Sequence, residues 1–275
     1  MRHLLLTAWA DITESLRSRW FAVYTLVFGG IIVGLFVTGL TESRILGFTG
    51  LSRVLVTYIE ITMAILPVFV LVTTVRSVAG DREAGIFEYM LSLPVALSVW
   101  YWGKFVGRFL VVYLPVLLAM GLGIAWGVAR GAAIPWTQVT YYTGFLFSLA
   151  LCFLGLGMLI SSLARTSDVA IGAAFILWLF LLLFMDLILL GVLVRGGLAP
   201  EGVIAIALAN PLQVFRTATM MLFDPQLVLL GPSAYVILDH FGHTGYLLWA
   251  LFYPALLGLA AAGTGYVLFR RGDLP

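Results

Sequence analysis

The sequence predicts an all-α integral membrane protein, and two observations carry this prediction. Of its 275 residues, 62% are hydrophobic and only 10% are charged, whereas soluble domains carry about 25% charged residues. The apolar residues gather in long runs, and a helix needs about 20 of them to cross the hydrocarbon core of a bilayer. These runs lack the alternation of a membrane-spanning strand. We therefore expect a single transmembrane domain that covers residues 1–275.

Six runs are long enough to span, at roughly residues 20–40, 54–75, 105–128, 141–163, 169–194 and 246–269. An even number of spans places both termini on the same side of the membrane. The basic residues on that side are Arg2, Arg17, Arg19, Arg76, Arg82, Lys104, Arg108, Arg165, Arg270 and Arg271. Those on the other side are Arg44, Arg53, Arg130, Arg195 and Arg216. Because basic residues favour the cytoplasmic side, we predict that both termini are cytoplasmic.

Residues 1–19 are predicted to form an amphipathic helix before the first span. Its apolar residues recur at helical spacing and are Leu5, Trp9, Ile12 and Leu16. Its polar residues fall mostly on other faces. Such a helix can lie along the cytoplasmic membrane surface. It would serve as a simple anchor or would bind a partner, and the two roles are compatible.

Residues 76–104 join spans two and three on the predicted cytoplasmic side, and they gather charges in an otherwise apolar chain. We expect Gly80 to break the chain after span two and Asp81 to cap the N-terminus of a new helix. The negative charge of Glu83, which follows Arg82, would then interact favourably with the helix dipole in the first turn. Pro94 is expected to stop this helix one residue earlier.

The helix predicted to start at Asp81 would be short and amphipathic. Its apolar side carries Ile86, Phe87, Met90, Leu91 and Leu93, and Glu88 lies off that side. One interpretation is an interfacial helix that rests in the lipid headgroups. The other is a coupling helix pressed into a groove of a cytoplasmic motor protein, oriented by its charges and anchored by its apolar residues. These residues alone support the two interpretations equally.

Residues 195–245, between spans five and six, are predicted to lie on the outer side. A helical stripe there consists of Leu208, Leu212, Phe215, Thr219 and Leu222. Arg216 lies off this stripe, and Asp224-Pro225 indicates a turn. The apolar stretch that follows is too short to cross the bilayer, so we expect a re-entrant or interfacial segment.

Two acidic residues fall inside predicted spans, Glu60 in span two and Asp186 in span five. An isolated carboxylate in lipid is costly, so each is expected to face protein or water, or to be protonated. For Glu60 we favour a polar packing contact or a place near the interface over a proton or cation pathway. For Asp186 both interpretations stay open.

The sequence lacks the motifs of an enzyme. Gly103-Lys104 does not complete a phosphate-binding loop, and the single Cys152 excludes an internal disulfide. Outer residues of metal-ligating types are Met220, Met221, Asp239, His240 and His243. Adjacent methionines cannot both face one site on a helix, which argues against a copper site. We expect no catalytic, cofactor-binding or metal-binding residue in this chain, and no nucleic-acid partner.

Three short motifs occur in order: Arg82-Glu83-Ala84-Gly85, Leu91-Ser92-Leu93-Pro94 and Gly103-Lys104. Together with the predicted spans and N-terminal helix, they resemble the ABC-2 family of ABC-transporter permeases. The sequence departs from that pattern at Ile86, where Thr is common, and at Ala96-Leu97, where Ser-Arg often follows the Pro. The resemblance implies a bacterial inner-membrane permease that pairs with a second copy of itself. It also implies that a separate cytoplasmic ABC ATPase binds ATP and Mg²⁺ and contacts Asp81–Leu91.

The outer stretch from Asn210 to Asp239 is similar to that of one permease subgroup, which serves maturation of nitrous oxide reductase. This resemblance implies a periplasmic β-helical partner and a role in assembling the copper centres of that enzyme. The residues expected to contact the partner are Leu212, Phe215, Arg216 and Asp224. The alternatives are an ABC-2 exporter of a lipid, drug or glycan, and an ATPase-independent secondary transporter or redox membrane anchor.

Overall fold

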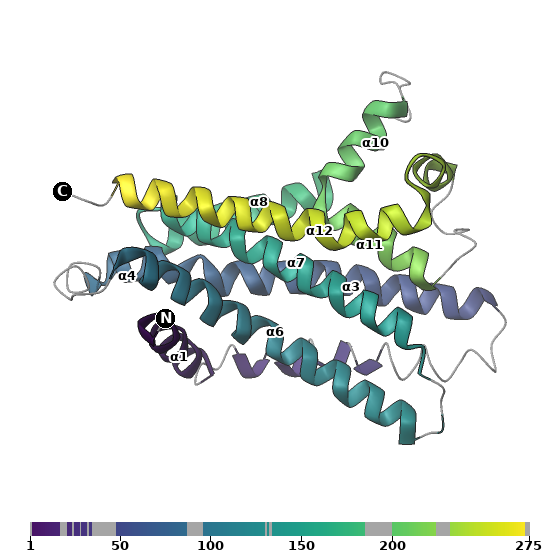
Figure 1. Ribbon diagram of the computed structural model, residues 1–275, viewed down its shortest axis with the longest axis horizontal. Coiled ribbons are helices and arrows are strands. Elements are labelled where there is room, and N and C mark those ends of the chain that lie inside the picture. The colour runs from purple at the N-terminus through teal and green to yellow at the C-terminus, as the bar shows by residue number, and fades with distance from the viewer. Residues whose placement is uncertain are drawn as a thin grey trace.

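The computed structural model describes residues 2–16, 21–34 except positions 24, 28 and 32, 48–86, 96–129, 131, 134–184, 200–223 and 232–272. These residues form helices and short connections, and they contain no strand. The all-α prediction is therefore confirmed for this part of the chain. The long helices run side by side along the longest axis of the molecule (Figure 1).

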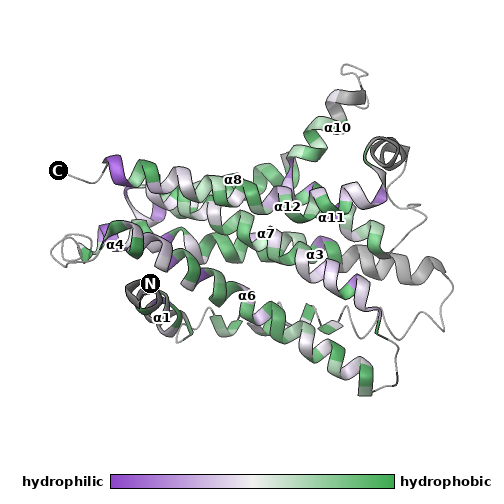
Figure 2. Ribbon diagram, in the orientation of Figure 1, coloured by the Kyte–Doolittle hydropathy of each residue, from purple (hydrophilic) through white to green (hydrophobic). Residues whose placement is uncertain are grey.

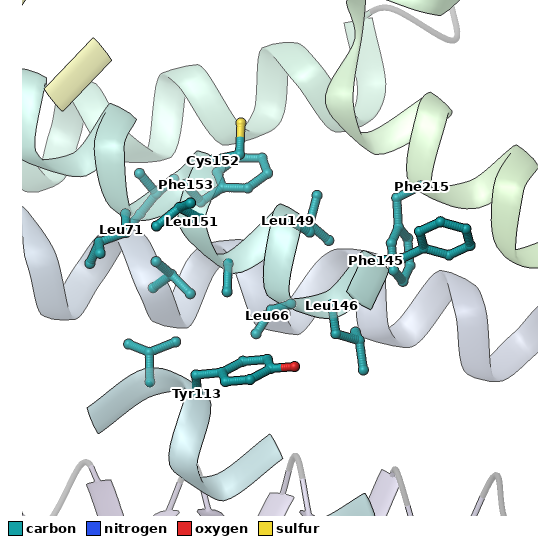
Figure 3. Close-up of a cluster of buried hydrophobic side chains, with 14 of the residues drawn as sticks. Leu66, Leu71, Tyr113, Phe145, Leu146, Leu149, Leu151, Cys152, Phe153 and Phe215 are labelled. Carbon is teal, nitrogen blue, oxygen red and sulfur yellow. The ribbon is translucent and has the colours of Figure 1, made fainter. Parts of the chain in front are cut away.

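Helix α7 (Trp136–Leu163) lies at the centre of the bundle. It packs against α12 (Pro232–Gly272), α3 (Phe48–Thr74), α6 (Leu97–Ala129) and α11 (Pro211–Phe223). Most of its inward-facing side chains are fully buried, among them Phe145, Leu149 and Phe153. Figure 3 shows Phe145 of α7 meeting Phe215 of α11, and Leu66 of α3 close to α7. The core is thus built around this one helix.

Helices α7 and α12 approach so closely at one crossing that only glycine fits. A Cβ atom added to Gly155 would lie 1.9 Å from the carbonyl oxygen of Gly258. A Cβ atom added to Gly258 would lie 2.3 Å from the carbonyl oxygen of Leu151. Small residues permit this kind of close backbone packing between membrane helices.

In the part of the chain that the structure describes, four helices are long and apolar enough to cross a membrane: Ile59–Glu83, Leu97–Ala129, Trp136–Leu163 and Phe241–Arg271. They contain the predicted spans three, four and six and most of span two, which was predicted to begin at residue 54. The predicted spans one and five fall only partly within the described residues, as helical pieces around Phe21–Ile31 and as the shorter apolar helix Ser167–Leu183. The first of these four extends beyond its predicted end, because α4 (Arg76–Glu83) continues α3 through Val75.

Pro254 interrupts the hydrogen-bond ladder within α12, as expected of proline in a helix. The backbone amide of the next residue, Ala255, donates instead to the hydroxyl of Ser148 on α7, at 3.0 Å. Ser148 is fully buried. This hydrogen bond links the two central helices next to the interruption.

Helix α1 (Arg2–Leu16) packs against α6. The buried carboxylate of Asp11 lies 3.1 Å from Nε of Arg108. At Gly107 the helices touch, since a Cβ atom there would lie 2.8 Å from the carbonyl oxygen of Ala8. The side chain of Trp9 is 66% exposed. The apolar side of α1 therefore faces away from the bundle, which fits the predicted amphipathic helix.

The predicted outer segment forms two helices, α10 (Pro200–Ala209) and α11, rather than the one helix expected from the stripe. Asn210 separates them, so Leu208 belongs to α10. Helix α12 then begins at Pro232 and bends at Gly242, where φ is +66°. Figure 1 shows α10 projecting from the bundle and the first part of α12 turning across its longer part.

We predict that Gly258→Ala destabilises the bundle, because the new methyl group would collide with the backbone of α7 and force the helices apart. Overpacking of this kind costs about 1–3 kcal/mol. Thermal unfolding of the detergent-solubilised protein measures the change. Gly263→Ala is the matched control on the same helix, since a Cβ atom there meets nothing within 4 Å. Equal stability of the two variants would contradict the close crossing.

Candidate functional site

The polar residues of the bundle concentrate at one end, which we call the charged end. Helix α8 spans Ser167–Leu179. The charged end comprises α4, the turn that joins α7 to α8, the start of α6 and the last turn of α12, which carries Arg270 and Arg271. Figure 2 shows hydrophilic residues at the end of α12 and at α4, whereas the middle of the bundle is mainly hydrophobic. The opposite end of the molecule carries α10 and α11 (Figure 1).

Asp81 forms an ion pair with Lys104 of α6. The same ammonium group donates to the carbonyl oxygen of Ser77 at 2.8 Å and lies 4.9 Å from the ring centroid of Trp100. Both charged side chains are mostly shielded, at 12% and 20% exposed. Such a pair is less screened by salt than a surface pair. Lys104 therefore ties α4 to α6.

Arg82 and Glu83 each satisfy the end of a neighbouring helix. The guanidinium of Arg82 donates to the carbonyl oxygens of Ala164, at 2.5 Å, and Ser162, at 3.3 Å. The carboxylate of Glu83 accepts from the backbone amide of Ser167 at 3.0 Å. Helix C-termini leave carbonyls without partners and helix N-termini leave amides without partners. Two adjacent side chains thus bind the end of α7 and the beginning of α8.

The Ser167 amide and hydroxyl, which hydrogen-bond to Glu83, lower the pKa of that carboxyl group, and the nearby charge of Arg76 acts in the same direction. Glu83 is therefore ionised at neutral pH. A negative charge beside a helix N-terminus is favourable because it complements the helix dipole. The dipole argument made from the sequence applies to Glu83, but the helix concerned is α8.

A buried hydroxyl also fixes the backbone of α4. Oγ of Ser161 on α7 accepts from the amides of Val78 and Ala79, at 3.0 Å each. Ser77 donates to the carbonyl oxygen of Thr74 and to the sulfur of Met158. Backbone and side chains of α4 are both held, so this helix is a rigid continuation of α3.

The predicted start of the charged helix at Asp81 is wrong. Gly80 lies inside α4 and does not break it, and Asp81 pairs with Lys104 instead of capping a helix. The chain turns later, at Gly85, where φ is +68°. The apolar-to-polar change at Gly80 resembled a helix end, but contacts with α7 and α8 carry the helix through it.

The exposed tip of the charged end consists of Glu83, Ala84, Gly85 and Ile86. Ile86 is helical and 45% exposed. Asp81 and Arg82 are half-buried by their contacts within the chain. The other residues predicted to contact a motor protein, namely Phe87, Glu88, Met90 and Leu91, lie outside the described residues.

At the opposite end, Glu60 and Arg216 form an ion pair between α3 and α11, at 2.8 Å. The favoured interpretation of Glu60 as a polar packing contact fits this geometry. Leu212 and Phe215 are almost fully buried inside the chain. They are therefore unavailable in this structure for the outer contact predicted for them. Asp224 and Asp186 lie outside the described residues.

The described residues contain no group of three or more His, Cys, Asp and Glu side chains that could hold a metal ion. Met220 and Met221 are buried in the core, whereas His243 is exposed. Cys152 is also buried between α7 and α12. Among these residues, the features that stand out are therefore helix-end contacts and an exposed polar tip.

A mainly apolar bundle with several span-length helices and a polar helix at one end defines a multi-pass membrane protein. The sequence profile described as ABC-2 family transporter protein matches residues 5–274. The chain belongs to this family and is an ABC-2 type permease subunit of an ABC transporter. The resemblance noted in the sequence is thereby confirmed.

Two relatives are each called "Probable ABC transporter permease protein NosY". The chain is 28% identical to the protein from Pseudomonas aeruginosa over 223 residues, which is 78% of this chain and 80% of the relative. It is 28% identical to the protein from Stutzerimonas stutzeri over 220 residues, with the same shares covered.

Ser161 and Ser167 at the charged end were not identified from the sequence. Ser161 and Ser167 act through a hydroxyl and a backbone amide, and small polar residues near a helix end give no distinctive signal. Lys104 did carry a signal, because it is the only lysine in the chain. Its partner became evident only when the fold placed α6 beside α4.

We predict that Lys104→Met destabilises the protein, because it leaves the carboxylate of Asp81 shielded and unpaired. Loss of a hydrogen-bonded charge costs about 1–3 kcal/mol. Adding Asp81→Asn should recover part of this loss, since no unpaired charge remains. Arg271→Met, at the exposed end of α12, is the control and should change little. Additive effects of Lys104→Met and Asp81→Asn in thermal unfolding would contradict the pairing.

Proposed function

We propose that this chain is the membrane subunit of an ABC transporter that serves maturation of nitrous oxide reductase, and that it transmits the motion of a cytoplasmic ATPase to the periplasmic side. The observation that carries the proposal is the similarity to two permeases called NosY over 78% of the chain. ATP and Mg²⁺ would bind the ATPase subunit, and two permease copies would pair. The transmitted motion would serve assembly of the copper centres of nitrous oxide reductase.

The arrangement of the charged end supports the ATPase contact. The tip Glu83–Ile86 is exposed, yet α4 behind it is held by Ser161, Lys104 and the α7–α8 turn. A force applied at the tip would therefore move α4 together with those elements rather than bend it. The excess of positive residues at this end supports its placement in the cytoplasm.

The outer helices α10 and α11 support a role for the opposite end. Helix α10 projects from the bundle (Figure 1), and Ala205 and Ala209 on it are exposed. A periplasmic β-helical protein would bind this end. Because Leu212 and Phe215 are buried, we assign the contact to α10 and the start of α12 instead of the buried face of α11.

The role in maturation is tested by deleting the gene in its own host and purifying nitrous oxide reductase. The proposal predicts that the reductase accumulates without the visible absorption of its copper centres, and that a plasmid copy of the gene restores this absorption. Reductase with normal copper content would contradict the proposal and favour an exporter of another compound.

We predict that Ile86→Asp weakens binding of the ATPase at least tenfold, since an apolar anchor is replaced by a charge, and tenfold corresponds to about 1.4 kcal/mol. Titration of the ATPase onto the permease in nanodiscs measures the affinity. His243→Asp places the same charge at an exposed position of the opposite end and should bind normally. Equal affinity of the ATPase for the two variants would show that Ile86 does not contribute to the interface.

A further inference from the structure

Helix α8 is bound to a different element at each of its two ends. At its beginning, the backbone amide of Ser167 donates to Glu83 of α4 at 3.0 Å. At its far end, the π-helical turn η2 (Phe180–Phe184) continues α8, and the carbonyl oxygen of Leu181 accepts from Nδ2 of Asn210 at 2.8 Å. At about 1.5 Å per residue, these two contacts are about 21 Å apart along the helix.

Asn210 is completely buried at the corner between α10 and α11. Its amide group binds η2, and its Oδ1 atom accepts from the backbone amide of Leu212 at 3.0 Å, which caps α11. A π-helical turn departs from the regular ladder of α-helical hydrogen bonds. One side chain therefore connects this irregular turn directly to the outer helix.

The same corner is fastened to α12. Oη of Tyr253 donates to the carbonyl oxygen of Ala209 at 2.6 Å, and Nε1 of Trp249 donates to that of Leu208 at 3.4 Å. These carbonyls belong to the last turn of α10, where the helix cannot satisfy them itself. The corner thus has one attachment to α12 and a separate one to η2.

Between its two ends, the fully buried side chains of α8 are small, whereas Ile171 and Trp178 pack against the core while partly buried. Its buried residues are Ala170 and Ala174, and a Cβ atom on Gly172 would meet nothing within 4 Å. The larger side chains of Val169 and Ile176 are exposed. The small residues of the buried stripe offer few interlocking ridges, which favours movement of α8 along its neighbours, known as shear.

We propose that α8 with η2 is the link that carries displacement of α4 to the outer helices, and that Asn210 is the positioning residue at the outer joint. The inference rests on the proposed function and adds the path of the motion. Displacement of α4 moves the first turn of α8 through Glu83. The rigid helix moves η2, and Asn210 passes the movement to the corner between α10 and α11. Helix α10 then tilts about the attachment of its end to α12 by Trp249 and Tyr253.

The test uses the permease–ATPase complex in nanodiscs with two pairs of spin labels. The outer pair is Ala205→Cys with Trp136→Cys, and the inner pair is Asp168→Cys with Arg270→Cys; all four positions are exposed. Cys152 is buried and should stay unlabelled. Pulsed electron–electron distances are measured with and without ATP and vanadate, in the parent chain and in Asn210→Ser.

Serine can still cap α11 but is too short to reach the carbonyl of Leu181. We expect ATP to shift both distances in the parent chain. In Asn210→Ser the inner shift should remain and the outer shift should be lost, with unchanged ATPase binding. The control Tyr253→Phe removes a hydrogen bond of the same corner to α12 alone, so the outer shift should remain.

If the outer shift survives in Asn210→Ser, the role proposed for Asn210 is wrong. The same holds if the outer shift is lost in both Asn210→Ser and Tyr253→Phe. Loss of both shifts in Asn210→Ser would also overturn it, because the residue would then govern the whole bundle. A parent chain that binds no ATPase would contradict the proposed function itself, and the link would fall with it.

Discussion

Carbonyls and amides at helix ends have no partner within their own helix, and the need to satisfy them organises the structure. Side chains from neighbouring elements satisfy them here. Arg82 binds the end of α7, Glu83 binds the beginning of α8, and Tyr253 binds the end of α10. Each such contact also fixes one helix relative to another. The features that make the bundle stable in a bilayer therefore determine which helices would move together.

The close packing of α7 against α12 is the second constraint on the structure. The glycine crossing of α7 and α12 brings two backbones into contact, and the hydrogen bond from Ala255 to Ser148 lies near it. These two helices form the closely packed centre of the bundle. The fully buried side chains of α8 are alanines, although Ile171 and Trp178 also pack against the core. A tightly packed centre beside this helix is compatible with the proposed transmission of motion.

The membrane class, four of the six predicted spans and the polar character of residues 76–86 could be predicted from the sequence because each rests on local composition. The helix boundaries at that segment could not. In the sequence, Gly80 resembles the end of a helix. In the structure, the hydroxyl oxygen of Ser161 on α7 accepts hydrogen bonds from two backbone amides of α4 and holds this helix in place. Likewise, the apolar stripe of α11 was identified from the sequence. The sequence does not show whether such a stripe faces a partner or the core of its own chain, and here it faces the core. The pairing of Glu60 with Arg216 depends on distant segments and needed the fold.

We propose that the charged end binds an ATPase while the opposite end binds a periplasmic protein. Site-specific photo-crosslinking in living cells tests it most directly, with the photoreactive residue placed at Ile86 or at His243, both of them exposed. We predict that Ile86 crosslinks to an ATP-binding protein and that His243 crosslinks to a protein of the periplasm. Crosslinks from both positions to the same protein, or an ATPase captured at His243, would contradict this assignment of the two ends.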